Sequence, residues 1–402
     1  MFDLNHFIGK YVTKRPQSMF LQDIENNKDE LIRKIKGKTV LVVGGAGSIG
    51  SSFIKVILPF EPATLVVVDT NENALAELTR DLRSTKGMYV PEDYVPYPMD
   101  FASPVFEKMF RKRGGFDIVG NFSAHKHVRS EKDIYSVEAL LQNNVLHAKL
   151  LLDLLTEFPP EEYFCVSTDK AANPVNIMGA SKRIMEDVIF AYSDKFPVKT
   201  ARFANVAFSN GSLPAGFIAR LQKLQPISAP SDVKRYFVSP EESGQICMLA
   251  CMLGKNREIF FPRLEEEQMM TFDKIATAFL QENGFEVLEC ASDEEAIDKA
   301  EELKKGSHRY PVHYSDSNTS GEKAYEEFYT ETESLDLNRL KALGIVTGKE
   351  IPDKERVKVL FDELNNLFKK EETTKKEVIA IMKAYLPNFE HIETGKSLDS
   401  KM

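Results

Sequence analysis

The chain has 402 residues, of which 43% are hydrophobic and 28% are charged. This length allows two or more domains with a large core. The formal net charge of −9 argues against a nucleic-acid partner, because binding to phosphates needs a concentrated basic surface. No stretch has the roughly eighteen consecutive apolar residues that span a bilayer, and the first residues lack the order of a signal peptide. We therefore expect no membrane partner and a cytoplasmic location.

Residues 1–36 are predicted to form a partly helical lead-in. From residue 37 to residue 206, short apolar segments alternate with helical patterns, which is typical of a parallel sheet covered by helices on both faces. The sequence therefore predicts an α/β fold with a Rossmann-like, doubly wound parallel sheet over 37–206. We expect residues 238–262 to join this domain.

After residue 206 the alternation weakens, and segments rich in Gly, Pro and Ser indicate loops. We expect 207–237 and 263–336 to form a smaller, discontinuous substrate-binding region. Residues 283–310 are charged and helix-prone, and an insertion is one interpretation of them. Residues 337–402 are predicted to form a C-terminal extension with two amphipathic helices, packed on the body or on a second subunit, and a disordered tail.

The segment GGAGSIG places Gly44, Gly47 and Gly50 between a predicted strand and a predicted helix. Backbone N–H groups and the helix N-terminus can meet a pyrophosphate there, because no Cβ stands in the way. Asp69 ends the next strand, 19 residues after Gly50, where a carboxylate accepts hydrogen bonds from ribose hydroxyls. The same carboxylate would repel a 2′-phosphate, so the pattern favours NAD over NADP.

Two polar residues near this turn leave alternatives open. Asp100 follows the third strand, where a side chain commonly meets the adenine, but Asp100 or Ser103 could equally be a helix N-cap. Asn144 falls on the apolar face of a predicted helix, and a buried amide needs partners. We interpret Asn144 as a residue that holds the active-site lysine through the backbone, the alternative being a purely structural role.

The stretch from Val166 to Arg183, VSTDKAANPVNIMGASKR, carries a hydroxyl cluster followed by the layout Y-x-x-x-K, with Met178 in the tyrosine position and Lys182 in the lysine position. With the glycine turn, Asp69 and the motif NNV at 143–145, this block resembles the extended short-chain dehydrogenase/reductases. More narrowly, the chain resembles the nucleotide-sugar 4,6-dehydratases of polysaccharide biosynthesis, whose type member acts on UDP-N-acetylglucosamine. The motifs SAHKHV, ARFANV, KRYFVSPEE and SGEKAYEE extend the resemblance over about 37 to 330.

The methionine narrows this resemblance further. Inverting members of the family keep Tyr in its position, whereas the configuration-retaining members have MGA(S/T)KR, as residues 178–183 do. The resemblance therefore implies a dehydratase that retains the configuration at C5. An inverting dehydratase or a 4-epimerase on the same substrate class is one alternative. A non-catalytic regulatory protein that binds NAD or a nucleotide sugar, in which Met178 records lost activity, is the other.

The resemblance implies removal of hydride from C4 of the sugar, loss of the C5 proton, departure of the C6 hydroxyl as water and return of the hydride to C6. Asp169 is then the general acid and Lys170 the general base, while Lys182 binds the nicotinamide ribose. Thr168 would hydrogen-bond the C4 hydroxyl. Met178 cannot accept a proton, so that hydroxyl must lose its proton through water, Asp169 or Lys170.

The family motifs also imply which residues bind the cofactor and the substrate. The expected catalytic set is Thr168, Asp169, Lys170, Met178 and Lys182. The expected NAD ligands are Gly44, Gly47, Ser48, Ile49, Gly50, Asp69, Asn71, Asp100, Phe101, Ala124, Lys126, Asn144 and Lys182. The expected UDP-sugar ligands are Asn205, Ser212, Arg235 and Glu322, with Arg235 on the phosphates or the uracil. His125 and His127 lack a carboxylate partner, so no metal site is expected, and the family implies a homo-oligomer, a dimer or higher.

Overall fold

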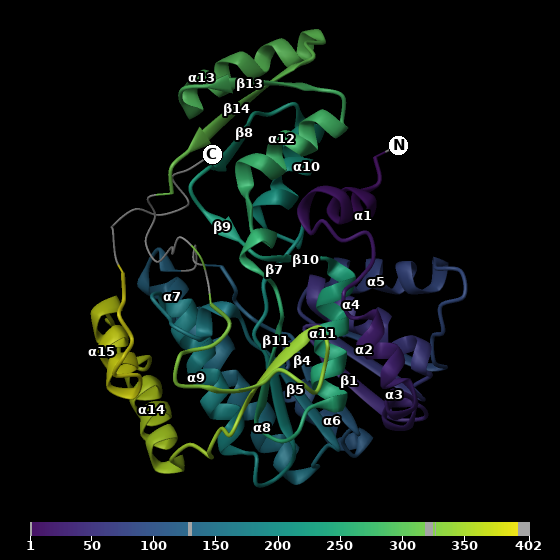
Figure 1. Cartoon of the computed structure of the whole chain (residues 1–402). Helices are drawn as coiled ribbons and strands as arrows, with labels where there is room; N and C mark the ends of the chain where they lie inside the picture. Colours follow the sequence, from purple (N-terminus) through teal and green to yellow (C-terminus); the bar gives the residue numbers. More distant parts are fainter. Residues whose placement is uncertain (1, 128–130, 318–324, 326, 393–402) are drawn as a thin grey trace.

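A mixed, mostly parallel sheet lies at the centre of the computed structural model, which describes residues 2–127, 131–317, 325 and 327–392 (Figure 1). Among these residues the sheet has nine strands in the order β15-β16-β11-β6-β5-β4-β1-β2-β3. All neighbours from β11 to β3 pair in parallel, while β16 pairs antiparallel with β11 and with β15. The strands are β1 (Thr39–Val43), β2 (Thr64–Asp69), β3 (Asp93–Pro98), β4 (Ile118–Asn121), β5 (Glu162–Val166), β6 (Val198–Ala201), β11 (Glu258–Pro262), β15 (Ser334–Asp336) and β16 (Leu343–Thr347).

The central strands are short and rich in branched apolar residues, such as TVLVV in β1 and TLVVVD in β2. Such strands suit a sheet that is buried on both faces. The order of the strands reverses beside β1, because β2 and β3 lie on one side of it and β4, β5 and β6 on the other. This is the topological switch point of a doubly wound fold, so the predicted Rossmann-like sheet is confirmed.

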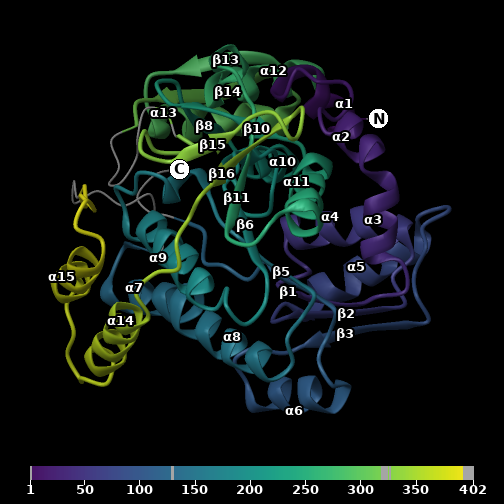
Figure 2. The same ribbon diagram turned by 60° about the horizontal axis from the view of Figure 1, so that its bottom comes forward.

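Helices cover both faces of the sheet (Figures 1 and 2). Helices α3, α4, α5 and α11 lie on one face, and α6, α8 and α9 lie on the other. At Gly244 of α11, a Cβ would lie 2.4 Å from the carbonyl oxygen of Ser52 in α4, so these two helices pack backbone to backbone. The bounds are α3 (Lys28–Ile35), α4 (Ser48–Ile57), α5 (Glu72–Ser84), α6 (Pro104–Arg113), α8 (His147–Glu157), α9 (Ile177–Ala191) and α11 (Pro240–Leu253). The helix α7 (Ile134–Leu141) leads into the π-helical η4 (Gln142–Leu146), and η2 (Leu58–Phe60) and η5 (Asp169–Ala171) are short 3-10 turns.

A second body of structure sits above the main sheet in Figure 1 and has its own aromatic core. Its parallel sheet has the order β13-β14-β8, and two short strand pairs, β7 with β10 and β9 with β12, connect it to the main body. The lead-in helix α1 and the π-turn η1 pack into this core, where Phe7 meets Phe279 with ring centroids 6.0 Å apart. The elements are α1 (Leu4–Phe7), η1 (Ile8–Val12), β7 (Asn205–Val206), α10 (Leu213–Lys223), β8 (Ile227–Pro230), β9 (Lys234–Arg235), β10 (Phe237–Val238), η6 (Glu266–Gln268), β12 (Met270–Thr271), α12 (Phe272–Glu282), β13 (Glu286–Cys290), α13 (Asp293–Lys299), η7 (Ala300–Lys305) and β14 (Arg309–Ser315). The lead-in helix α2 (Leu21–Asn26) packs on the main core instead, through Ile24 and the preceding Phe20.

The chain departs from the expected organisation in two places. Residues 283–310 were expected to be helix-prone, and besides α13 and η7 they contain β13 and the start of β14, two of the three strands of the second sheet. Residues 334–336 and 343–347 belong to the main sheet as β15 and β16, although the sequence suggested the substrate region and the C-terminal extension. The strand β16 (LGIVT) is buried against β11, but it is a single apolar run far from the alternating block that revealed the other strands.

The two predicted C-terminal helices are α14 (Lys354–Leu367) and α15 (Lys375–Tyr385), and they pack on the body beside α9 (Figure 1). Their apolar faces are buried, including Leu360 and Leu364 of α14 and Met382 of α15. The disordered tail was expected over the last twelve residues, 391–402. His391 and Ile392 are instead described, with a contact to Glu131 and a hydrogen bond to Val175, while residues 393–402 lie outside the described residues. Within the part of the chain that the structure describes, no helix is both long and apolar enough to cross a bilayer.

Candidate active site

A pocket of about 1190 Å³ lies between the main sheet and the second body of structure. Its walls come from the carboxyl ends of β1, β5 and β6 on one side, and from β8, β9 and α10 on the other. In a doubly wound fold, the carboxyl ends of strands on the two sides of the switch point form a crevice where ligands bind. The pocket lining includes Gly44, Gly47, Ser48, Ile49, Gly50, Ala124, Lys126, Thr168, Lys170, Met178, Lys182, Asn205, Ser212 and Arg235, all predicted site residues.

The glycine turn has the geometry that a bound phosphate requires. Gly44 has φ +70°, and a Cβ on it would lie 2.5 Å from the backbone nitrogen of Ser123. A Cβ on Gly50 would lie 2.4 Å from the carbonyl oxygen of Gly44, so both positions exclude a side chain. Gly47 is the N-cap of α4, and its added Cβ would meet nothing nearer than 3.4 Å. The N-terminus of α4 therefore faces the pocket with room for an anion.

Asp69 ends β2 beside this turn and is fixed by the backbone. Its carboxylate accepts hydrogen bonds from the backbone nitrogens of Ala46 (3.0 Å) and Asn71 (2.9 Å). The side chain of Asn71 is the N-cap of α5, where it accepts from the backbone nitrogen of Ala74. Neither side chain lines the pocket, but Asp69 keeps further lone pairs that can accept hydrogen bonds from a ligand.

The structure shows which of Asp100 and Ser103 is the N-cap of the helix that follows β3. Ser103 is the N-cap of α6 and accepts a hydrogen bond from the backbone nitrogen of Phe106, whereas Asp100 accepts from the backbone nitrogen of Ala102 at 2.8 Å. Phe101 is buried, and its ring meets His147 edge-on with centroids 6.0 Å apart. Neither Asp100 nor Phe101 lines the pocket, so a contact of either residue with an adenine stays a prediction.

Asn144 lies in the π-helical turn η4 and is buried with its amide engaged. It accepts a hydrogen bond from the backbone nitrogen of His125 (2.9 Å) and donates to the carbonyl oxygen of His125 (3.0 Å) and to the hydroxyl of Ser181 (3.1 Å). Asn144 therefore connects the loop after β4 with α9, one residue before Lys182. A direct link from Asn144 to Lys182 stays a prediction.

Three consecutive residues after β5 form a hydrogen-bonded cluster. The buried Asp169 accepts through Oδ1 from the hydroxyl of Thr168 (2.7 Å), the backbone nitrogen of Lys170 (2.9 Å) and Nζ of Lys170 (3.1 Å). Thr168 and Lys170 line the pocket, and Asp169 lies between them in sequence. An acid, an amine and a hydroxyl are thus held together at the carboxyl end of a central strand, where they can move protons on a ligand.

Met178 and Lys182 lie one turn apart at the start of α9, and both line the pocket. The ammonium of Lys182 donates to the carbonyl oxygen of Val166 at 3.1 Å. Burial lowers the pKa of Lys182, although the charge of nearby Glu186 partly offsets this. Met178 is therefore a buried thioether one turn from a buried amine that is held by a backbone carbonyl.

Two residues near this cluster, Gly179 and Glu131, were not among the predicted site residues. A Cβ on Gly179 would lie 2.7 Å from the carbonyl oxygen of Lys170, so α9 packs directly against the turn η5. The sequence shows a glycine between Met178 and Ala180, but it does not show that the carbonyl oxygen of Lys170 lies against it. The buried carboxylate of Glu131 accepts from the backbone nitrogen of Met178 at 2.9 Å, a contact across 47 residues that has no local sequence signal.

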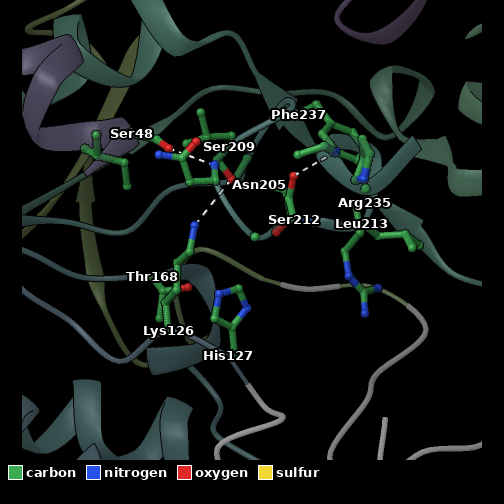
Figure 3. Close-up of a pocket in the computed structure, with 18 of the residues that line it drawn as sticks. Ser48, Lys126, His127, Thr168, Asn205, Ser209, Ser212, Leu213, Arg235 and Phe237 are labelled. Carbon is green, nitrogen blue, oxygen red and sulfur yellow. Dashed lines mark hydrogen bonds between the residues drawn. The ribbon is translucent and has the colours of Figure 1, made fainter. Parts of the chain in front are cut away.

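The expected substrate ligands line the side of the pocket that faces the second body (Figure 3). Nζ of Lys126 donates to the hydroxyl of Ser209 at 3.4 Å, and burial lowers the pKa of Lys126. The hydroxyl of Ser212 is the N-cap of α10, while the guanidinium of the buried Arg235 donates to the carbonyl oxygen of Lys234. Glu322 lies outside the described residues. Asn205 lines the same wall (Figure 3).

Glu186, Arg202 and Glu333 form a buried ion-pair network next to the cluster of Thr168, Asp169 and Lys170. The hydroxyl of Ser167 donates to Glu186, and Arg202 binds Glu186 (2.8 and 2.7 Å) and Glu333 (2.8 and 3.1 Å). Burial alone raises the pKa of Glu333, but its hydrogen bonds to Arg202 and Lys349 outweigh that effect and lower the pKa to about 2. The network therefore holds α9 and the residue before Thr168 in a fixed relation.

Comparison with known sequences gives a family and several relatives. The model of the family described as "Polysaccharide biosynthesis protein" matches residues 40–347. An uncharacterized membrane protein of Methanocaldococcus jannaschii, MJ1061, is 30% identical over 351 residues, which are 85% of this chain and 95% of that protein. The probable polysaccharide biosynthesis protein EpsC of Bacillus subtilis is 30% identical over 58% of this chain, but the match spans only 38% of EpsC. The inverting UDP-N-acetylglucosamine 4,6-dehydratase of Campylobacter jejuni serotype O:23/36 is 27% identical over 57% of this chain and 67% of that enzyme.

Solved structures share the fold at low sequence identity. Pen from Bacillus thuringiensis has a TM-score of 0.60 and 20% identity over 79% of this chain and 90% of its own. The UDP-N-acetylglucosamine 4-epimerase of Methanobrevibacter ruminantium M1 has a TM-score of 0.54 and 14% identity over 82% of this chain and 98% of its own. DesIV, a dTDP-glucose 4,6-dehydratase of Streptomyces venezuelae, has a TM-score of 0.53 and 19% identity over 72% of this chain and 87% of its own. One fold thus serves proteins with different named activities.

Proposed function

The chain belongs to the polysaccharide biosynthesis protein family, and on that basis we propose that it is an NAD-dependent nucleotide-sugar 4,6-dehydratase. The proposed reaction converts UDP-N-acetylglucosamine to the UDP-4-keto-6-deoxy sugar, with the configuration at C5 retained. The observation that carries the proposal is the cluster of Thr168, Asp169 and Lys170 in one pocket with Lys182 and the glycine turn.

The residues around the glycine turn fit a dinucleotide. Gly44 and Gly50 exclude side chains by their contacts, Gly47 leaves the N-terminus of α4 open, and Asp69 is held by backbone N–H groups beside them. Bound NAD would accept hydride from C4 and give it back to C6. In this proposal Lys182 holds the nicotinamide ribose through its ammonium, and Asp69 accepts hydrogen bonds from the adenosine ribose.

The proton steps fall to the Asp169 cluster. Lys170 removes the C5 proton, which the neighbouring C4 carbonyl makes acidic, and Asp169 gives a proton to the departing C6 hydroxyl. The two groups are 3.1 Å apart, so transfer of a proton from the Lys170 ammonium to the Asp169 carboxylate gives the neutral amine and the acid that these two steps need. Thr168 already donates its hydroxyl hydrogen to Asp169, and its oxygen remains free to accept a hydrogen bond from the C4 hydroxyl. The proton of that hydroxyl leaves through water, Asp169 or Lys170 as C4 gives up its hydride.

The retained configuration is proposed from Met178. The thioether cannot take up a proton, so deprotonation and reprotonation at C5 rest with the Lys170 and Asp169 pair on a single face of the sugar. Return of the proton from the face that lost it retains the configuration. An inverting dehydratase needs a proton donor on the opposite face, and a 4-epimerase needs no acid for the C6 hydroxyl at all.

The test is incubation of the purified protein with UDP-N-acetylglucosamine in D₂O, followed by mass spectrometry and proton NMR. Loss of one water, a new C6 methyl signal and a product with the original C5 configuration support the proposal. The opposite C5 configuration would identify the inverting enzyme, and a C4 epimer without loss of water would identify the epimerase. Tight UDP-sugar binding without turnover would identify the regulatory protein.

The subunit number and the location stay predictions. The proposed state is a homo-oligomer, a dimer or higher, in the cytoplasm. Light scattering of the purified full chain measures the first, and a monomeric mass at micromolar concentration would contradict it.

A further inference from the structure

The first turn of α9 donates a backbone hydrogen bond to a side chain outside its own helix. Its N-cap, Asn176, accepts from the backbone nitrogen of Gly179 at 2.7 Å. The backbone nitrogen of Met178 donates instead to Oε1 of Glu131 at 2.9 Å. Backbone N–H groups in a first helical turn have no partner within the helix, and a carboxylate at that end is favoured by the helix dipole. Glu131 therefore fixes the residue in the tyrosine position by its backbone.

Glu131 is in turn held by the C-terminal end of the described chain. Its other carboxylate oxygen lies 3.4 Å from Nε2 of His391, and its carbonyl oxygen accepts from Nζ of Lys375 at 2.9 Å. The side chains of Glu131 and His391 are only 7% and 5% exposed, so their contact is shielded from water. The backbone nitrogen of Ile392 donates to the carbonyl oxygen of Val175 at 3.0 Å, one residue before the N-cap of the same helix.

The segment that makes these contacts is firmly attached to the body. Phe389 is 2% exposed and belongs to the main core, with its ring 6.0 Å from that of His391. Arg356 of α14 donates to the carbonyl oxygen of Tyr385 at the end of α15, and its guanidinium lies 4.9 Å from the Tyr385 ring centroid. Lys354 pairs with Asp194 just after α9 at 2.9 Å. The pair α14 and α15 is thus a rigid support rather than a loose appendage.

We propose that Glu131 is a positioning residue of the active site and that the segment from Lys375 to Ile392 holds it against the start of α9. The two C-terminal helices then serve catalysis through a defined path, from His391 to Glu131 to the backbone of Met178, and one turn further to Lys182. The kinetic test of this inference rests on the proposed dehydratase activity. The structural test, by hydrogen exchange, does not.

The kinetic test compares Glu131→Ala, Glu131→Gln, His391→Ala and the double variant Glu131→Ala/His391→Ala in the full chain. We expect Glu131→Ala to lower kcat about tenfold, the effect of one hydrogen bond to a charged acceptor, with KM for UDP-N-acetylglucosamine unchanged within about twofold. Glu131→Gln keeps an acceptor for Met178 and should restore most of kcat. The double variant should be no slower than Glu131→Ala, because His391 acts through Glu131. Glu363→Ala, on the exposed face of α14, is the matched control.

The structural test measures amide hydrogen exchange in the first turn of α9 at matched temperature and pH. Faster exchange at residues 177–180 in His391→Ala, with unchanged exchange in the central strands, supports the proposal whether or not the parent protein turns over UDP-N-acetylglucosamine. Unchanged exchange there overturns it. The proposal is also overturned if the losses in kcat of Glu131→Ala and His391→Ala add in the double variant. A folded Glu131→Ala with the kcat of the parent overturns it as well. If Glu131→Ala does not fold, Glu131→Gln and His391→Ala decide the question by the same exchange measurement.

Discussion

The close contact between Gly179 and Lys170 makes a quantitative prediction for Gly179→Ala. The new Cβ would lie 2.7 Å from the carbonyl oxygen of Lys170, 3.1 Å from Oδ1 of Asn176 and 3.2 Å from Cβ of Lys170. Ordinary van der Waals contact begins at 3.4 Å, so α9 and η5 must separate by 0.7 Å, the difference between 3.4 and 2.7 Å. Backbone and N-cap atoms surround the site, so rotation of a flexible side chain cannot relieve the clash.

The separation should affect catalysis more than stability. Overpacking costs about 1–3 kcal/mol, and replacement of a helical glycine by alanine returns about 1 kcal/mol, so we expect a net loss of about 0–2 kcal/mol in the free energy of unfolding. Displacement of a catalytic group by 1 Å can lower the rate about a hundredfold, so a shift of this size should lower kcat about tenfold or more. Dehydration of UDP-N-acetylglucosamine measured with chemical denaturation of the same samples separates the two effects.

The control for stability is Gly216→Ala in α10, where an added Cβ meets nothing within 4 Å. This variant should gain helix propensity without a clash, and its free energy of unfolding should rise. A Gly179→Ala variant that keeps kcat within about twofold of the parent would refute the reasoning, because the proposed catalytic turn would then tolerate the displacement.

Three further predictions follow from the site. Gly44→Ala places a Cβ 2.5 Å from a backbone nitrogen at φ +70°, so we expect loss of NAD binding in equilibrium dialysis; retained affinity would contradict the assigned pyrophosphate turn. Asp169→Asn removes the proposed acid and should lower dehydration about a hundredfold or more while UDP affinity by calorimetry stays within about twofold; an active variant would reassign the acid. Glu333 has a pKa lowered to about 2, so its stabilising charge is present above pH 4.5 and is lost as the pH falls toward 2. Glu333→Gln should therefore lower the free energy of unfolding by about 3 kcal/mol at neutral pH, and this free energy should then fall less steeply between pH 4.5 and 2. The exposed Glu331→Gln should leave both unchanged. An unchanged slope below pH 4.5 in Glu333→Gln would count against the ion-pair network.

Local sequence signals were sufficient for the parts of the molecule that local chemistry determines. The strands β1, β2 and β5 are apolar runs next to helical patterns, and the glycine turn lies where one strand meets one helix. The spacing of Met178 and Lys182 placed both on one helical face, and the structure brings both to the pocket. These features involve residues that are near neighbours in the chain.

Contacts between distant residues could not be predicted in this way. Glu131 reaches Met178 across 47 residues, and Arg202 reaches Glu333 across 131, with no pattern at either end to indicate the partner. The strand β16 was assigned to the C-terminal extension because its partner β11 lies about 80 residues earlier, beyond any local periodicity. Ser212 was expected on the substrate; it lines the pocket with its hydroxyl accepting the N-cap hydrogen bond of α10, and a contact with the substrate stays a prediction.

The lead-in has a consequence for biosynthesis. The hydroxyl of Tyr11 donates to Glu282, 271 residues later, and Phe7 packs on Phe279 in the same aromatic core. A ribosome releases residues 7–12 long before it makes their partners, so these aromatic side chains stay without their native contacts for most of translation. Contacts of such long sequence separation slow folding and prolong exposure to aggregation. We therefore expect the newly made chain to depend on chaperones that bind exposed aromatic segments until α12 has left the ribosome.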